Sequence, residues 1–348
     1  MENISKMVHC GDPSYGGTMY GCPHCGELKF VAFRCHAKFC PTCGNKYCID
    51  RSSKMASKLI QCDHRHLVFT IDEDLRPFFL NDRSLLDCLF QAVRSVILEM
   101  FHKLNKKKNF VPGFVCVLHS FGRPLEWNPH IHCLLTEGGF SDDGFWRVVK
   151  YFDYTYLRKA FQTALLNEME SRIGTSFKTT KSSIYSKDKN GFYVYAKPNL
   201  CDVDTVVKYI SRYLGRPVIA TSRIDDYDGR FVIFHYTRHE DQKTIYECVP
   251  ALRFIKRLII HIPEKHFKMI RYYGLYAKNH KHKSSLLLAV PIEKRRFLVS
   301  LNTWRTSLLL SFGFDPLLCK CGHHMTVLEI CHKGTPLIEM YRKILNSS

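Results

Sequence analysis

The sequence lacks any apolar run of about 18 residues, the length that a membrane-spanning helix needs. It also lacks an amphipathic basic helix of the kind that binds a membrane surface. We therefore expect no membrane partner. Residues 1–9 contain no apolar segment of a secretory signal, so we expect a protein of the reducing cytosol, with free thiols rather than disulfides.

Acidic residues are scarce relative to basic ones. The 348 residues include 51 Lys and Arg but only 32 Asp and Glu, which gives a formal net charge of +19. Such an excess favours a polyanionic partner, most simply nucleic acid. The chain shows no internal repeat or low-complexity tract, and its hydrophobic fraction of 45% is ordinary for a globular protein.

Cysteine, in contrast, is abundant, with 16 residues. Two C-P-x-C-G motifs stand out, at residues 22–26 and 40–44. Each motif predicts a tight turn whose backbone N–H groups face the sulfurs, and two such turns make a tetrahedral four-sulfur zinc site. The sequence therefore predicts structural Zn²⁺ bound by Cys22, Cys25, Cys40 and Cys43.

Further cysteines remain for additional sites. Near the first two motifs, Cys10, Cys35 and Cys48 could form part of a second N-terminal site. Close to the C-terminus, the motif C-K-C-G-H-H at residues 319–324, with Cys331 beyond it, resembles half a zinc knuckle. It is a candidate for another metal site.

The stretch at residues 128–137 places two histidines at the head of an apolar run. In a strand, alternate side chains share a face, so His130 and His132 project together while Ile131 and Cys133 face a core. Neutral imidazoles that converge in this way can hold a metal that also accepts phosphate oxygens. The alternative is an ordinary strand that contains two histidines.

A third ligand for this metal can be sought nearby. If a strand over residues 114–119 forms a hairpin with residues 130–136, His119 lies across from the histidine pair. Glu126 is the alternative, because a carboxylate suits Mg²⁺ or Mn²⁺. A rival H-x-H motif, His64 and His66, stands at the start of another predicted strand, at residues 66–71.

The remaining periodicity predicts an α+β fold in which a central antiparallel sheet is backed by helices. Apolar spacing predicts a long helix over residues 84–106 and one or two helices over 145–173. A lysine-rich loop is expected over 178–189. Further strands are expected at 192–196, 231–236 and 244–249, and a basic helix follows at 250–261.

A second informative helix is predicted over residues 204–217, where Gly215 and Pro217 end it. Tyr209 and Tyr213 are four residues apart and therefore share a face. Such a pair is commonly core packing. Here, however, the cations Lys208, Arg212 and Arg216 flank the phenols, and cations beside a phenol favour a phenolate or bind a phosphate.

Together these features indicate one chemistry. A metal held by histidines would polarise a scissile phosphate, and a tyrosine oxygen would attack it. The products are a 5′-phosphotyrosine link and a free 3′-OH. Because the link conserves the energy of the phosphodiester, rejoining needs no ATP.

At this point the chain resembles the rolling-circle HUH transposases of bacterial insertion sequences with an N-terminal zinc-binding domain, the IS-ninety-one type. The matching segments run along most of the chain. They are the cysteine motifs at 22–25 and 35–43, H-L-V-F-T at 66–70, L-R-P at 75–77, residues 121–139 around N-P-H-I-H, V-Y-A-K-P at 194–198, residues 209–213 and R-Y-Y-G at 271–274.

The resemblance implies roles for these residues. His130 and His132 would bind a catalytic Mg²⁺ or Mn²⁺, with His119 as our choice of third ligand, and Tyr209 and Tyr213 would be the nucleophiles. His64 and His66 fall on the family's first strand, outside its metal motif. The sequence departs from many relatives at Gly16–Thr18 and at Phe39, where they carry histidines.

The resemblance also implies domains and partners. We expect a zinc-binding domain at residues 1–55, an HUH tyrosine-nuclease domain at 56–250 and a basic C-terminal region at 251–348. The expected substrate is single-stranded DNA at transposon ends and target, in the bacterial cytoplasm at the nucleoid. The alternatives are a replication initiator or relaxase of the same chemistry and a non-catalytic zinc-stabilised DNA-binding regulator.

Overall fold

The computed structural model divides the chain into two compact units. It describes residues 2–37, 40–56, 58–104, 109–141, 143–149, 151–200, 218–238, 240–280, 292–300, 303–332, 335–336 and 338–339. The larger unit contains Met55–Leu214 and Val218–Arg295, and the smaller contains Met1–Lys54 and Arg296–Ser348. Compactness thus splits the region 251–348 near Arg296, whereas the functional division at residues 55 and 250 stays a prediction.

The larger unit is built on an antiparallel sheet with the strand order β11-β4-β5-β3-β7, and β6 pairs with β5 at one end. This architecture confirms the predicted α+β class with a central antiparallel sheet. The strands are β3 (His64–Phe69), β4 (Val111–Phe121), β5 (Trp127–Phe140), β6 (Trp146–Val148), β7 (Val194–Leu200) and β11 (Ile270–Gly274).

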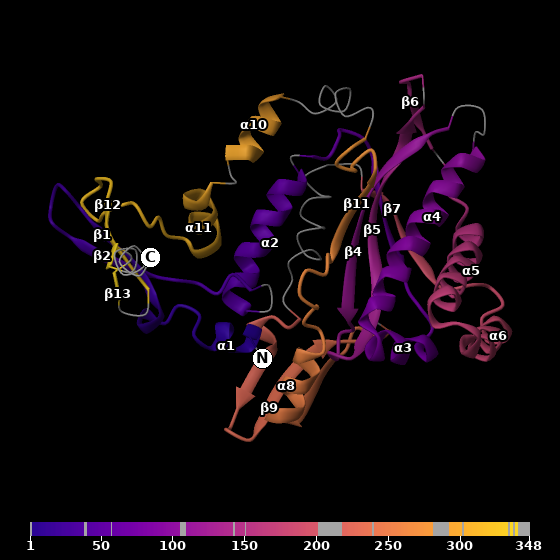
Figure 1. The fold of residues 1–348 in the computed structure, drawn as a ribbon, viewed down its shortest axis with the longest axis horizontal. Coiled ribbons are helices and arrows are strands. Elements are labelled where there is room, and N and C mark those ends of the chain that lie inside the picture. The colour runs from indigo at the N-terminus through magenta and orange to yellow at the C-terminus, as the bar shows by residue number, and fades with distance from the viewer. Residues whose placement is uncertain are drawn as a thin grey trace, which may run out of the picture. The chain divides into compact units, whose positions relative to one another are not determined.

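Strand alternation gives this sheet two different faces. One face is apolar and packs against α4 (Leu86–Leu104) and α5 (Tyr154–Ile173), which Figure 1 shows on the same side of the sheet. Strand residues in this main core include Leu67, Phe69, Phe114, Cys116, Leu118, Ile131, Cys133 and Leu135. The other face carries a smaller apolar cluster, in which Val115, Val117 and Leu134 meet Met55 and Leu59.

The predicted long helix is confirmed as α4, whose buried residues recur at helical spacing. The region predicted as helix over 145–173 is different at its start, because residues 146–148 pair with β5 as β6. α5 then begins at the Asp153 cap, whose side chain accepts a hydrogen bond of 2.9 Å from the backbone N–H of Tyr156.

The lysine-rich segment predicted as a loop is instead the helix α6 (Lys178–Lys187). The helix is held by a buried Ile184 and by an ion pair of 2.7 Å between Lys181 and Glu170. Lys187 also pairs with the carboxylates of Asp72 and Asp74, each at 3.0 Å. These tertiary contacts override the weak local signal. A short helix, α3 (Arg76–Asn81), precedes α4.

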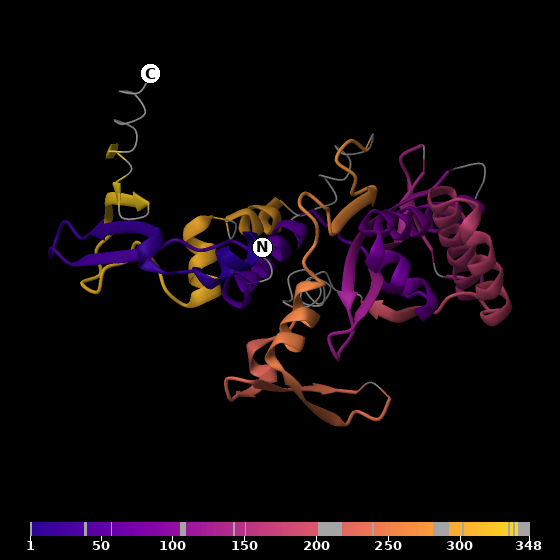
Figure 2. The ribbon, with the colours of Figure 1, turned by 60° about the horizontal axis from the view of Figure 1, so that its bottom comes forward.

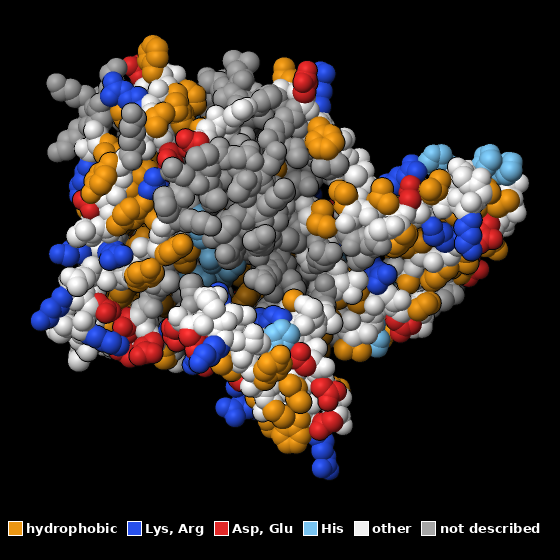
Figure 3. All heavy atoms as spheres, turned by 180° about the vertical axis from the view of Figure 1, so that it is seen from behind, with side chains coloured by type: hydrophobic (Ala, Val, Ile, Leu, Met, Phe, Trp, Pro, Cys, Tyr) orange, Lys and Arg blue, Asp and Glu red, His pale blue; other side chains and the backbone are white. Residues whose placement is uncertain are grey.

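A small three-stranded sheet with the order β10-β9-β8 also belongs to the larger unit. Its elements are β8 (Ile224–Tyr227), β9 (Phe231–Thr237), β10 (Thr244–Pro250) and α8 (Ala251–Ile259). The predicted hairpin of β9 and β10 is confirmed. Figure 2 shows α8 beside this sheet, where Phe254 packs on Phe234 in a core that also includes Leu125. On the outer surface of this small sheet, hydrophobic and acidic side chains lie next to one another (Figure 3).

The smaller unit is built on a four-stranded sheet with the order β13-β12-β1-β2. Its strands are β1 (Gly16–Gly21), β2 (Leu28–Ala32), β12 (Thr326–His332) and β13 (Thr335–Pro336). The helices that belong wholly or mostly to it are α1 (Glu2–Val8), α2 (Pro41–Ala56), α10 (Ile292–Ser300) and α11 (Trp304–Phe312). Among the described helices of the chain, none is long and apolar enough to cross a membrane.

The end of β11 makes a close backbone approach that only glycine allows. Gly274 has φ +57°, and a Cβ there would collide with the carbonyl oxygen of Pro112. That oxygen accepts a hydrogen bond of 3.1 Å from the N–H of Leu275. We predict that Gly274→Ala destabilises the larger unit by about 2–4 kcal/mol, seen as a lower urea midpoint.

The matched control is Gly229→Ala. Gly229 also has a positive φ, +93°, but nothing lies within 4 Å of a Cβ there. This control should lose only about 1 kcal/mol, the cost of the conformation without the collision. Equal losses in the two variants would contradict the steric explanation.

Candidate metal centre

Four histidines gather on the sheet face opposite α4 and α5. His119 lies on β4, His130 and His132 on β5, and His66 on β3. The predicted hairpin of β4 and β5 is confirmed, and its register places His119 directly opposite His130. One ring nitrogen from each of His119, His130 and His132 lies within 4.8 Å of the others. Glu126, the alternative third ligand, is exposed and is not part of this group.

Hydrogen bonds orient two of these rings. His130 Nδ1 lies 2.7 Å from the carbonyl oxygen of Asn128, so this nitrogen carries a proton and donates it. The Nε2 lone pair of His130 then faces His132 Nε2 at 3.1 Å. On its other side, His132 Nδ1 lies 2.9 Å from Nε2 of His66. A bond at Nδ1 is the usual device that fixes a ligating imidazole in the tautomer with a free Nε2.

Burial favours the uncharged form of His130 and His132. Loss of solvent lowers the pKa of His130 and lowers the pKa of His132 well below its ordinary value, and neighbouring histidines lower the latter further. Neutral rings offer lone pairs at neutral pH. Two nitrogens bound to one divalent ion at about 2.1 Å lie roughly 3.0–3.4 Å apart. The observed 3.1 Å between His130 and His132 therefore fits a shared cation.

The two histidines of the rival H-x-H motif make hydrogen bonds within the sheet region and are not part of the group of three metal-ligand candidates. His64 is fully buried, its Nδ1 lies 2.8 Å from the carbonyl oxygen of Cys62, and its Nε2 lies 2.7 Å from the hydroxyl of Tyr276. His66 supports His132 instead. Sequence reasoning missed this supporting role, because it depends on β3 lying next to β5, and no local pattern states the order of strands.

The predicted nucleophiles Tyr209 and Tyr213 lie outside the described residues, as do the predicted DNA contacts Lys208, Arg212 and Arg216. Their roles stay predictions from the sequence and the resemblance.

Eight of the described cysteines form two clusters of four, and the expected pairing of the two N-terminal motifs was wrong. Cys40 and Cys43 lie with Cys10 and Cys35, with the Cys43 sulfur 3.5 Å from that of Cys10 and 3.6 Å from that of Cys35. Cys22 and Cys25 lie instead with Cys319 and Cys321. The side chain of Cys48 is outside the described part of the chain.

The hairpin of β1 and β2 explains why the two motifs separate. Cys22 and Cys25 are in the turn that joins these strands, whereas Cys10 and Cys35 flank their open end. A strand of six residues such as β1 spans roughly 20 Å. The 14-residue spacing between the motifs is therefore filled by structure that keeps them apart. A hydrogen bond of 3.0 Å from Gly11 N–H to the Phe33 carbonyl brings Cys10 beside Cys35.

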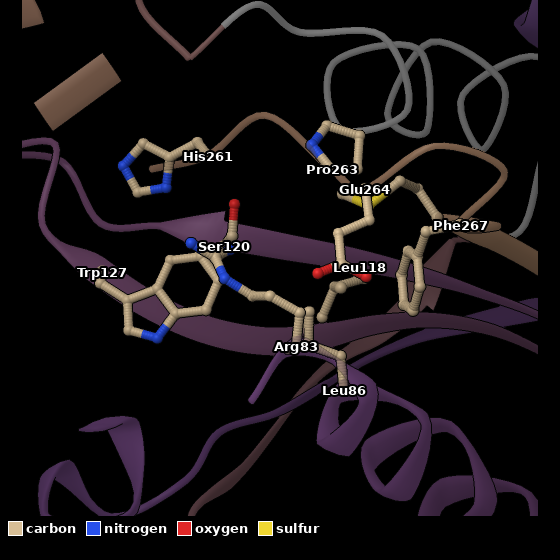
Figure 4. Close-up of a pocket in the computed structure, with 10 residues that line it drawn as sticks. Arg83, Leu86, Leu118, Ser120, Trp127, His261, Pro263, Glu264 and Phe267 are labelled. Atoms are coloured by element: carbon tan, nitrogen blue, oxygen red, sulfur yellow. The ribbon is translucent and has the colours of Figure 1, made fainter. Parts of the chain in front are cut away.

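A separate pocket lies on the helix-covered side of the sheet (Figure 4). Leu118 and Ser120 reach it from β4, and these residues alternate with His119, which faces the other way. The Arg83 guanidinium stacks on the Trp127 ring at 4.0 Å and closes one side. The pocket is therefore distinct from the histidine centre.

Comparison with known proteins agrees with the family resemblance along most of the chain. A family model described as "Transposase zinc-binding domain" matches residues 1–71, and one described as "Putative transposase" matches residues 113–284. The "Transposase for insertion sequence element IS801" of Pseudomonas savastanoi pv. phaseolicola is 29% identical over 291 residues, which cover 80% of this chain and 70% of that protein. The "Putative transposase y4qJ" of Sinorhizobium fredii (strain NBRC 101917 / NGR234) is 25% identical over 301 residues, 80% and 74% of the two chains. No solved structure matches.

The matched zinc-binding domain and the thiol clusters together support structural zinc in this chain. Four thiolates at about 2.3 Å around a tetrahedral Zn²⁺ lie about 3.8 Å from one another, close to the sulfur separations observed here.

Buried neutral histidines predict a loss of stability in acid. Burial lowers the pKa of both His64 and His261 to about 4. Between pH 6.5 and 4 these histidines bind a proton in the unfolded chain but not in the folded chain. Their contribution to the free energy of unfolding is therefore complete above pH 6.5 and is lost as the pH falls. Each group should remove about 1 kcal/mol between pH 7.5 and 5.5.

The measurement is urea unfolding at these two pH values for the wild type and for His64→Gln. The variant should lose less stability than the wild type, by about 1 kcal/mol. His102→Gln is the control, because His102 is exposed and its substitution should leave the pH dependence unchanged. Identical pH dependence in the wild type and His64→Gln would contradict the assignment.

Proposed function

Because this chain belongs to the insertion-sequence transposases that carry the IS91-type zinc-binding domain, we propose that it nicks and rejoins single-stranded DNA through a 5′-phosphotyrosine intermediate. DNA is the partner that a transposase requires, and the net charge of +19 suits a polyanion. The observation that supports the chemistry best is the group formed by His119, His130 and His132.

In the proposed reaction, the histidines on the sheet bind the metal and the tyrosines supply the nucleophile. Mg²⁺ or Mn²⁺, when bound by the three histidines, would supply Lewis-acid polarisation of the scissile phosphate. The phenol of Tyr209 or Tyr213 loses its proton, and its oxygen attacks phosphorus. The bond between phosphorus and the 3′ oxygen breaks, this oxygen takes up a proton and becomes the 3′-OH, and the 5′ phosphate stays on the tyrosine. Attack by a 3′-OH reverses the step and rejoins the strand.

The protein supplies orientation and the correct protonation state. Asn128 and His66 hold His130 and His132 with their Nε2 atoms turned toward a common point. Among the proposed metals, three imidazoles favour Mn²⁺ over the harder Mg²⁺. The cations Lys208, Arg212 and Arg216, close to the tyrosines in sequence, would hold the backbone of a single strand.

The thiol cluster of Cys10, Cys35, Cys40 and Cys43 would bind structural Zn²⁺ and have no chemical step. It would fix the start of α2 against the segment before it, where a short chain has little core of its own.

A covalent adduct tests the chemistry. Labelled single strands from the element's own ends, incubated with the full chain and Mn²⁺, should yield a labelled protein band on a denaturing gel. The double variant Tyr209→Phe with Tyr213→Phe should yield none, because no phenol is left to attack. The control Tyr246→Phe, an exposed tyrosine on β10, should behave as the wild type.

The single variants identify the first nucleophile. Loss of the adduct in Tyr209→Phe but not in Tyr213→Phe would assign Tyr209. A wild type that binds these strands without any adduct would favour the non-catalytic DNA-binding alternative, and an adduct in the double variant would place the nucleophile elsewhere.

The supporting role of His66 gives a second test. His66→Ala removes the partner of His132 Nδ1, so Mn²⁺ affinity measured by calorimetry should fall about 10–100-fold. His66→Gln, whose amide oxygen can accept the same hydrogen bond, should recover part of the loss. His102→Ala is the control, and unchanged affinity in His66→Ala would overturn the role.

A further inference from the structure

The second thiol cluster joins residues from the two ends of the chain. The Cys22 sulfur lies 3.6 Å from that of Cys321, and the Cys25 sulfur lies 3.5 Å from that of Cys319. These partners are separated by 299 and 294 residues in sequence. All four sulfurs lie within 4.8 Å of one another, and the separations of 3.6 and 3.5 Å are close to the roughly 3.8 Å expected around a tetrahedral Zn²⁺.

The two contributing turns are closed in a similar way, by a backbone hydrogen bond over four residues in the first and over three in the second. In the first, the N–H of Gly26 donates to the carbonyl of Cys22 at 3.0 Å, and in the second the N–H of Gly322 donates to the carbonyl of Cys319 at 3.0 Å. Both glycines follow the second cysteine of their turn and have positive φ, +75° and +85°. The shorter C-x-C spacing of the C-terminal motif therefore still forms a knuckle.

Strand pairing brings these turns together. β1 pairs with β12 in antiparallel register from Gly16 and His332 to Gly21 and Thr326. Cys22 directly follows β1, and the C-terminal knuckle precedes β12, so both turns stand at the same end of the sheet. The core between them is small: it contains Tyr20, Cys22, Cys319 and Met325. A core of this size needs a metal to hold it.

We propose that Cys22, Cys25, Cys319 and Cys321 bind one Zn²⁺ that ties the N-terminal segment to the C-terminal segment. This is a second zinc site, distinct from that of Cys10, Cys35, Cys40 and Cys43. The matched zinc-binding domain ends at residue 71, so half of the ligands come from outside it. The sheet that carries the histidine centre is then an insertion between two halves of one zinc-bound unit.

The chemistry of the thiols agrees with this site. Zn²⁺ binds cysteine as the thiolate, and four sulfur ligands from two tight turns are a common ligand set of a structural zinc site. His24 and His323 stack on each other at 3.8 Å beside the cluster, and with Cys321 they form an alternative, exposed ligand set. Whether these histidines bind the zinc is tested with the variants described below.

Zinc stoichiometry of the full chain decides the matter. Native mass spectrometry should find two zinc ions in the wild type and one in the double variant Cys319→Ser with Cys321→Ser. The matched control changes Cys248 and Cys331 to Ser, since these thiols lie outside both clusters, and should keep two. Cobalt substitution gives a second reading: the thiolate-to-metal absorption should fall by half in the cluster variant.

Hydrogen exchange separates loss of the site from loss of the fold. In the cluster variant, amides that pair β1 with β12 should lose protection, while those that pair β3 with β5 keep it. One zinc in the wild type, or two in the cluster variant, would overturn the proposal. So would loss of a zinc in His24→Ala with His323→Ala while the cysteine variant keeps both.

Discussion

The two-residue repeat of a β-strand is the constraint on which this structure depends. Along β4 and β5 every second side chain enters the core under α4 and α5, and these positions are apolar. The intervening positions face away: some form the smaller apolar cluster with Met55 and Leu59, and others carry the histidines. These are His119, His130 and His132, so the same strands that bury the core also aim three imidazoles at one point.

The orientation of the two rings in that centre is fixed by the hydrogen bonds that their Nδ1 atoms make. His130 is held by a carbonyl two residues away on its own strand, whereas His132 is held by His66 from the neighbouring strand β3. The first restraint is local, but the second depends on the sheet being assembled. Coupling ligand geometry to strand order in this way ensures that the centre exists only in the folded sheet.

Prediction from the sequence succeeded where the cause was local. The alternation around His130, the hairpin that carries His119 and the periodicity of α4 each arise from neighbouring residues, and each was found. It failed where distant segments meet. α6 is stabilised by Glu170, Asp72 and Asp74, and the motif at Cys22 found its partners almost 300 residues later. Spacing alone paired that motif with the nearest one, because a sequence does not show that a hairpin lies between them.

Because β1 pairs with β12, the smaller unit of this transposase is built from both ends of the chain, and the larger unit lies between them in the sequence. Because β12 follows the inserted unit in the sequence, β1 can pair with β12 only after the whole of that unit has been synthesised. A sheet with so small a core gains little from apolar burial alone. Thiol coordination is the interaction best suited to close it, because a metal supplies in one site the stability that a larger core would otherwise provide.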